Sequence, residues 1–364
     1  MKPLEQGKKD KKMKRKHIII LIIGILFVSL LSGCSVVAHK IYSKQFGIRY
    51  KEISERGSYT TSLTWKEIDQ NKYAREEVRF NSGKNRLQGF IYGEANDKGL
   101  VVISHGLGGT ADAYFPMIMC FVDNGWRVFA FSNTGVSGSE GKNVRGLTQS
   151  VIDLDAALTY VKHSSTLGNL PVMLVGHSWG GYAVCAVLDH KHDVNAVISF
   201  AGFNNGPEMF REQGVFSAGG FYYLLSPQFW AIQRLLFGST MKLTAIEGIN
   251  KAGIPVMIVH SSDDNLISPN TTSIYAYRAK VTNPYAEFIF LDGDDAAGHA
   301  FPFSSKEMRE YRTIADENLQ KYRAETESPS FSQWAEQYNF DKIKANELNG
   351  ELMERINMFF DNAR

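Results

Sequence analysis

The chain has 364 residues, of which 44% are apolar and 21% charged, so it can bury a sizeable core in one large or two small domains. Its first 16 residues hold eight of the 40 basic residues and two of the 38 acidic ones, which leaves a net negative charge on the rest. That body lacks the basic surface that nucleic-acid binding needs, and three cysteines are too few for a disulfide framework.

The N-terminus predicts attachment to a bacterial membrane. Residues 18–38 carry no charge, and as a helix they would span about 31 Å, enough to cross a bilayer core. The basic tail before them should stay in the cytoplasm, which places the rest of the chain outside. Both an uncleaved transmembrane helix and a lipid anchor are compatible with this segment. The stretch Leu31-Ser32-Gly33-Cys34 resembles the lipobox of bacterial lipoproteins, in which the cysteine is lipidated.

Three regions follow from these patterns. Residues 1–38 form the basic tail and the membrane anchor or lipoprotein signal, and residues 39–74 are polar and mixed, which indicates a stalk or an N-terminal extension. Residues 75–364 form the main domain.

Apolar runs and amphipathic stretches alternate along the main domain. Strands are predicted at 76–80 and 87–93 (a hairpin), 100–104, 126–131, 171–175, 194–200, 254–259 and 286–291, and helices at 111–123, 148–163, 182–188 and 346–362. Strands that alternate with helices predict a mostly parallel sheet with helices on both faces.

The alternation stops over residues 204–243, which are rich in aromatic residues and glycines. Some forty residues are too many for a plain connection between two core strands, so this segment is predicted to be an inserted cap. Its aromatic residues would pack the cap onto the sheet, and some would line an apolar substrate pocket. The sequence does not assign individual residues to either role.

The most informative motif is Gly176-His177-Ser178-Trp179-Gly180, which lies between a predicted strand and a predicted helix. A G-x-S-x-G sequence in this context is typical of a nucleophile elbow, in which a strained turn exposes the serine hydroxyl. Glycines flank the serine because a Cβ at either position would clash with the neighbouring strand or helix. The alternative is a chance match in a glycine-containing loop. The position of the motif between a strand and a helix favours the elbow, so Ser178 is predicted to be a catalytic nucleophile.

With this motif in place, the chain resembles the α/β-hydrolase superfamily, and most closely the bacterial serine hydrolases akin to monoacylglycerol lipases and prolyl-oligopeptidase-like esterases. The resemblance covers residues 75–301 and the final helix. It implies the α/β-hydrolase fold and a triad in the chain order Ser, Asp, His. The segment 260–267 matches the family pattern H-G-x-x-D-x-x-V, which makes Asp264 the acid, although Ser261 replaces the glycine and Asp263 is an adjacent competitor. His299 matches the catalytic histidine.

The resemblance also implies an oxyanion hole. The segment 105–109, His-Gly-Leu-Gly-Gly, matches the loop whose backbone amide, here that of Leu107, would act with the amide of Trp179. His105 is expected to pack under this loop. The segment 132–141 departs from the family pattern D-x-R-G-x-G-x-S-x-G, because the Asp and the Arg are missing.

Together these features predict a serine hydrolase, similar to carboxylesterases and lipases, that cleaves a small and apolar acyl ester at the outer face of the membrane. A peptidase or an acyltransferase of the same fold, or an inactive membrane-tethered binding module, are the alternatives. No cofactor is expected, since the sequence has no dinucleotide fingerprint, and no metal site, since it has no H-x-x-x-H motif or Cys/His cluster.

Overall fold

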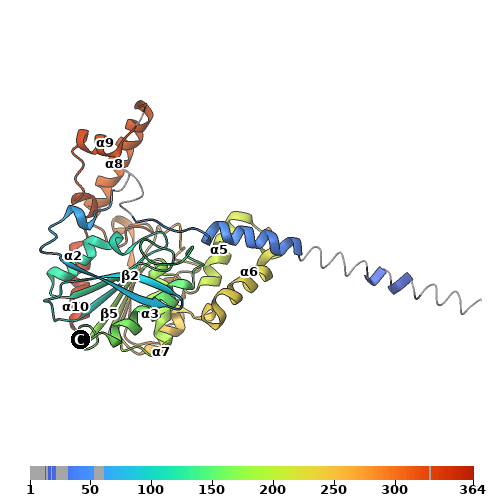
Figure 1. Ribbon diagram of the computed structural model, residues 1–364. Helices are drawn as coiled ribbons and strands as arrows, with labels where there is room; N and C mark the ends of the chain where they lie inside the picture. Colours follow the sequence, from blue (N-terminus) through green and yellow to red (C-terminus); the bar gives the residue numbers. More distant parts are fainter. Residues whose placement is uncertain (1–12, 14, 18, 22–31, 53–60, 328) are drawn as a thin grey trace, which may run out of the picture.

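A computed structural model describes residues 13, 15–17, 19–21, 32–52, 61–327 and 329–364. Its centre is one sheet of eight strands in the order β1-β2-β4-β3-β5-β6-β7-β8 (Figure 1). The strands are β1 (Arg75–Ser82), β2 (Asn85–Tyr92), β3 (Leu100–Ser104), β4 (Arg127–Phe131), β5 (Val172–His177), β6 (Ala196–Phe200), β7 (Val256–Ser261) and β8 (Ala286–Leu291).

The sheet is mostly parallel, as predicted. β2 pairs antiparallel with both β1 and β4, and the strands from β4 to β8 all pair in parallel. Every residue of β3, β5, β6 and β7 is buried, as expected for strands covered on both faces. The carboxyl ends of parallel strands meet at one edge of the sheet, so the loops after β3, β5, β7 and β8 come together there.

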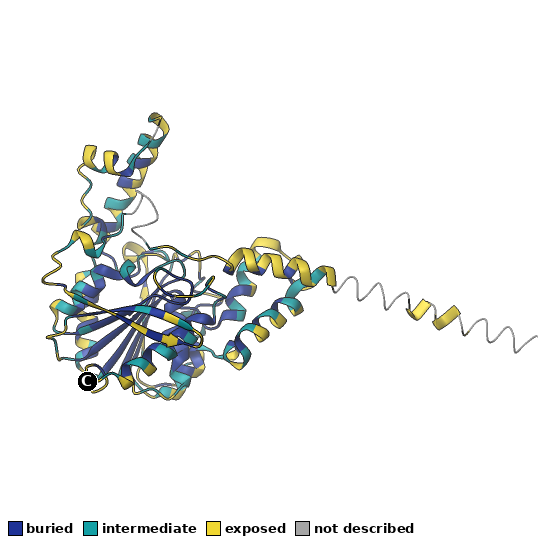
Figure 2. Cartoon of the chain, in the orientation of Figure 1, coloured by how far each residue is buried: buried dark blue, intermediate teal, exposed yellow. Residues whose placement is uncertain are grey.

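Helices cover both faces and form two cores (Figure 2). One face carries α3 (Gln149–His163), α4 (Trp179–Ala186) and α7 (Ala245–Ala252). The other carries α2 (Phe115–Asp123) and α10 (Gly350–Asp361). The predicted cap is α5 (Gly206–Ala218), α6 (Phe221–Phe237) and a short 3-10 helix (Gly238–Lys242), inserted between β6 and α7.

The predicted stalk or extension contacts the folded domain in its first part. Residues 32–46 form a helix that lies beside the cap (Figure 1). The rings of Tyr42 and Phe46 pack on Phe210 of α5, with centroids 5.5 and 5.7 Å apart. Beyond the helix, Tyr50 forms a β-bridge with Val136.

Most of the predicted membrane segment at 18–38 lies outside the described residues. Within the described part of the chain, no helix has both the length and the apolar character needed to cross a bilayer.

α7 was not predicted from the sequence, nor were the two helices α8 (Lys306–Glu325) and α9 (Phe331–Gln337). The last two lie together. They form an arm at the top of Figure 1 with a small core of their own, built around Phe331 and Trp334. Only three residues of the twenty in α8 are buried, so its sequence carries a weak apolar stripe, and this explains why the pattern was missed.

Candidate active site

Ser178 lies on a strained turn between β5 and α4. Its φ of 56° and ψ of −111° fall in a region that L-residues rarely adopt. The flanking glycines are required by close packing. A Cβ on Gly176 would lie 2.2 Å from the carbonyl oxygen of Gly180, and one on Gly180 would lie 1.9 Å from that of Ser104 in β3. This is the geometry that the motif predicts for a nucleophile elbow.

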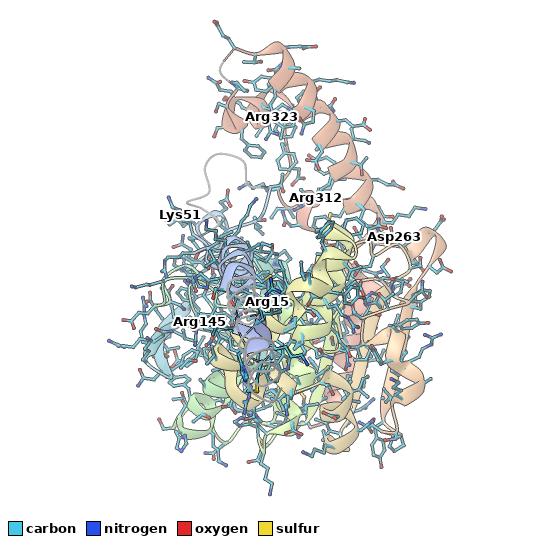
Figure 3. All side chains as sticks on the ribbon, turned by 90° about the vertical axis from the view of Figure 1, so that its right-hand side faces the viewer. Arg15, Lys51, Arg145, Asp263, Arg312 and Arg323 are labelled. Carbon is cyan, nitrogen blue, oxygen red and sulfur yellow. The ribbon has the colours of Figure 1, made fainter. Side chains whose placement is uncertain are left out.

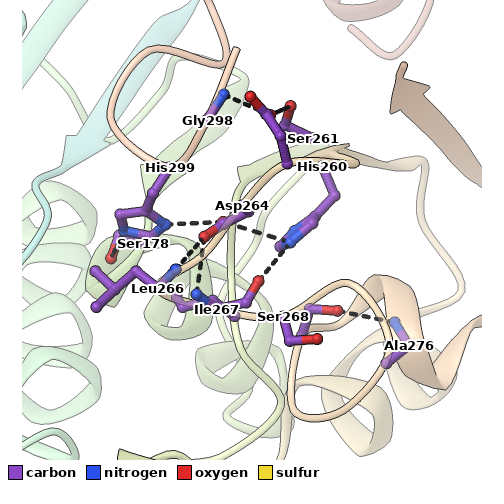
Figure 4. A network of polar contacts seen from close by, with 12 residues as sticks. Ser178, His260, Ser261, Asp264, Leu266, Ile267, Ser268, Ala276, Gly298 and His299 are labelled. Atoms are coloured by element: carbon purple, nitrogen blue, oxygen red, sulfur yellow. Dashed lines mark hydrogen bonds and ion pairs between the residues drawn. The ribbon is translucent and has the colours of Figure 1, made fainter. Parts of the chain in front are cut away.

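The structure brings together the three residues predicted as a triad (Figure 4). Nε2 of His299 lies 2.8 Å from Oγ of Ser178, and Nδ1 of His299 lies 2.8 Å from Oδ2 of Asp264. Because the carboxylate can only accept, Nδ1–H donates to it, and Nε2 is left to accept the serine hydroxyl. A serine, a general base and an orienting acid are thereby linked in series.

Asp264 is fixed by the turn that it begins. The backbone N–H groups of Leu266 and Ile267 donate to Oδ1, at 3.0 and 2.8 Å. Burial alone would raise the pKa of Asp264, but the hydrogen bond from His299 and the amide of Ile267 outweigh it and hold the pKa below its ordinary value. The carboxylate is therefore charged at neutral pH, as an acid that orients an imidazole must be.

Asp263, the competing acid, contacts the loop that carries His299 instead of its imidazole. Its Oδ1 accepts the hydroxyl of Ser261 at 2.5 Å and the N–H of Gly298 at 2.8 Å. The oxygen of Ser261 accepts the N–H of Ala297 at 2.8 Å. Ser261, which departs from the family pattern, thus has a structural reason: with Asp263 it fixes the two residues before His299.

The two predicted oxyanion-hole residues lie beside the serine. Leu107 follows β3, and Trp179 is the first residue of α4; both line the same cavity as Ser178. The first N–H groups of a helix have no acceptor within it, so the amide of Trp179 is available to an oxygen bound in front of Ser178. The positive end of the α4 dipole favours negative charge at the same point.

His177 is a residue of the site that the sequence analysis did not single out. The hydroxyl of Tyr114 donates to its Nδ1 at 2.7 Å, and its Nε2–H donates to the carbonyl of His299 at 2.8 Å. Burial, with a smaller contribution from the charge of His299, lowers the pKa of His177 to about 3, so it is neutral. The same tyrosine oxygen accepts the N–H of Gly106 at 3.0 Å. One neutral network therefore joins the oxyanion loop, the elbow and the histidine loop.

The loop at 132–141 is held in place without the Asp and Arg of the family pattern. The hydroxyl of Ser139 donates to the carbonyl of Ser132 and accepts the N–H of Gln88. The buried His105 accepts the N–H of Asn133 at 3.0 Å, which agrees with its expected packing role.

A cavity of about 770 Å³ opens in front of Ser178. Its apolar part is formed by the cap and by helix 32–46, and includes Ile41, Phe46, Met209, Phe210, Tyr222 and Phe229. A smaller polar part includes Ser62, Ser304, Arg312 and Asn346. No aspartate or glutamate is among the described residues that line it.

One cluster with metal-ligand chemistry lies outside the site. His190 and His192 both contact Oδ1 of Asp155, at 2.6 and 2.7 Å, and the three side chains are partly exposed. The histidines are two residues apart, so they do not form an H-x-x-x-H motif. Hydrogen bonds to the shared carboxylate account for this arrangement.

Comparisons with known proteins agree with this fold. Residues 95–241 match the family model Hydrolase_4, described as "Serine aminopeptidase, S33". The chain is 24% identical over 225 residues to an uncharacterized protein, YfhR, of Salmonella typhi, covering 58% of this chain and 68% of that protein. Among solved structures, it is similar to the esterase Pf2001 of Pyrococcus furiosus, with a TM-score of 0.51 and 15% identity over 80% of this chain and 97% of that one. The fold is that of α/β hydrolases.

Proposed function

We propose that this α/β-hydrolase fold carries a serine esterase that cleaves carboxylic esters with an apolar acyl group. The observation that carries the proposal is the strained Ser178, whose hydroxyl is hydrogen-bonded to His299 in series with Asp264. Strain at a residue of this kind is retained where function requires it. Neither a dehalogenase nor an epoxide hydrolase fits, because those reactions of the fold need an acid at the elbow.

The reaction follows from the directions of these hydrogen bonds. His299 accepts the proton of Ser178 as the serine oxygen attacks the ester carbonyl, and Asp264 stabilises the imidazolium. The amides of Leu107 and Trp179 donate to the oxyanion. His299 then returns the proton to the leaving alcohol, and a water, activated by the same imidazole, hydrolyses the acyl-enzyme.

The lining of the cavity favours an ester over an aminoacyl substrate. Recognition of a free amino terminus needs a negative partner, and the described lining offers no carboxylate. Its apolar part suits an acyl chain, and its polar part, with Arg312 and Asn346, suits a polar alcohol portion. Aminopeptidase activity is the second candidate, because the matching family model bears that description.

The location is part of the proposal. The uncharged residues 18–38 and the basic tail before them support a domain tethered to the outer face of a bacterial membrane, through a helix or through a lipid on Cys34. Incorporation of a labelled fatty acid in the expressing cell, compared with Cys34→Ser, distinguishes the two anchors. Label that depends on Cys34 identifies the lipid.

Fluorophosphonate labelling tests the nucleophile. Wild-type protein should be labelled, and Ser178→Ala should not. Ester preference is tested by comparing kcat/KM for p-nitrophenyl esters of increasing chain length with that for aminoacyl p-nitroanilides. Faster cleavage of the anilides would contradict the esterase proposal, and a folded wild-type protein that stays unlabelled would contradict both candidates.

A further inference from the structure

The exposed surface of the cap is more apolar than the surface of a helix that faces water. The seventeen residues of α6 include one charged side chain, Arg234. A helix that is apolar on nearly all sides is ordinarily buried in protein or in lipid. Only one side of α6 is buried, and the buried residues on that side are Tyr222, Phe229, Gln233 and Phe237.

The exposed side chains include large ones. Phe216, at the end of α5, is 89% exposed, and Phe221 and Leu235 of α6 are 78% and 86% exposed. Phe221, Leu224 and Leu235 are spaced by three and eleven residues, which places them on one side of α6. Monomeric soluble proteins rarely expose a contiguous apolar surface of this kind.

Helix 32–46 adds to the same side of the molecule. Figure 3 looks onto this side and shows the helix end-on beside the cap. Its exposed apolar residues include Val36, Val37 and Ile41. We call the surface formed by Val36, Val37, Ile41, Phe216, Phe221, Leu224 and Leu235 the cap face.

The cavity opens on the cap face. Ile41, Ser217, Ala218 and Phe221 all line the cavity and are also exposed. The mouth therefore lies between helix 32–46 and the junction of α5 and α6. An acyl chain that leaves the apolar part of the cavity reaches the cap face directly.

Two further observations indicate what covers the cap face. The uncharged segment at 18–38 overlaps helix 32–46, so Val36 and Val37 of the cap face belong to the predicted membrane segment. The charges of helix 32–46 and α6 are Lys40, Lys44 and Arg234, with no carboxylate in either helix. Cations beside an apolar surface are the pattern of helices that lie in an anionic bilayer interface.

We propose that the cap face lies in the surface of the lipid bilayer, so that the cavity opens into the membrane and takes its acyl substrates from it. The bilayer contact is argued from the exposed residues of the cap face alone, whereas the delivery of substrate rests on the proposed function.

Fluorescence quenching tests the contact without reference to activity. The full chain is reconstituted in vesicles of phosphatidylcholine and phosphatidylglycerol, with or without brominated acyl chains. The fluorescence added by Phe216→Trp should be quenched by at least half in brominated vesicles. The matched control is Met358→Trp on α10, exposed on the opposite side of the sheet, and its added fluorescence should be unchanged. An unquenched Phe216→Trp, whether the cap face meets water or a second copy, overturns the proposal.

Kinetics test the delivery. The double variant Phe216→Asp/Leu235→Asp should hydrolyse a long-chain ester in vesicles at least tenfold more slowly than wild type, and a short water-soluble ester at the wild-type rate. Met358→Asp should leave both rates unchanged. Equal rates on the vesicle ester in wild type and the double variant overturn the delivery. A wild-type protein that hydrolyses neither ester, with Phe216→Trp still quenched, contradicts the proposed function and leaves the bilayer contact supported.

Discussion

The hydroxyl of Tyr114 lies 2.7 Å from Nδ1 of His177 and 3.0 Å from the backbone nitrogen of Gly106. Burial raises the pKa of Tyr114, so the hydroxyl keeps its proton and donates it to the histidine. One oxygen thereby contacts both the residue before Ser178 and the residue before Leu107.

Replacing that hydroxyl should impair both stability and catalysis. Tyr114→Phe leaves Nδ1 of His177 and the N–H of Gly106 without a partner, which should cost about 1–3 kcal/mol of unfolding free energy. Movement of the oxyanion loop should lower kcat by about tenfold. Urea unfolding and ester hydrolysis measure the two effects. Tyr73→Phe, whose hydroxyl contacts Asp123, is the control and should keep the wild-type kcat. An unchanged kcat in Tyr114→Phe would show that the network does not position the loop.

Substitution of the two adjacent acids, Asp263 and Asp264, should have very different effects on kcat. Asp264→Asn removes the charge that fixes the tautomer of His299, and kcat should fall by about 10⁴-fold. Asp263→Asn affects only the loop before His299, so kcat should fall by less than about tenfold. Steady-state rates on a soluble ester, with circular dichroism to check folding, measure both. The reverse order would make Asp263 the acid of the triad.

His177 should make the protein less stable at low pH. A histidine paired with a carboxylate has the opposite effect, because its pKa is raised by folding. The pKa of His177 is about 3 when folded and near 6.5 when unfolded, so the unfolded chain binds a proton that the folded protein does not. Stability is therefore lost as pH falls below about 6.5, by about 2 kcal/mol between pH 7 and pH 5.

Urea unfolding of wild type and His177→Gln at pH 7 and pH 5 isolates this contribution. The free energy of unfolding of the variant should not show the decrease that His177 causes between the two pH values. His163→Gln, at an exposed position, should keep it. A wild-type slope that survives in His177→Gln would assign the pH dependence to other groups.

The elbow should not tolerate a methyl group. Gly180→Ala would place a Cβ 1.9 Å from the backbone oxygen of Ser104, which cannot move without shifting β3. We expect a loss of about 3 kcal/mol or more in stability, and no fluorophosphonate labelling. At Gly350 an added Cβ meets no atom within 4 Å, so Gly350→Ala should raise the unfolding free energy by about 0.4–1 kcal/mol. A stable and labelled Gly180→Ala would refute the packing argument.

The sequence predicted the sheet and the elbow well because both depend on local patterns. Continuous apolar runs marked the buried strands, and Gly176 and Gly180 had to be glycine for reasons that the backbone alone imposes. Ser178 was predicted from its motif, and Asp264 and His299 from the family patterns that their segments resemble. The structure places the three within hydrogen-bond distance.

What the sequence did not predict depends on contacts between distant segments. Nothing local distinguishes His177 from any other residue at the variable position of G-x-S-x-G, since its role comes from Tyr114, 63 positions away. The role of Ser261 is visible only once Ala297 lies beside it. The packing of Phe46 on Phe210 joins two segments that were assigned to separate regions.

Helix 32–46 forms part of the wall of the cavity through Ile41, Gln45 and Phe46. A recombinant fragment that begins at residue 75 would therefore lack part of the cavity wall, and a substrate preference measured on it would not represent that of the full chain. Under the proposed anchoring, exchange of residues 1–46 for the leader of another protein would therefore change a wall of the cavity as well as the anchor.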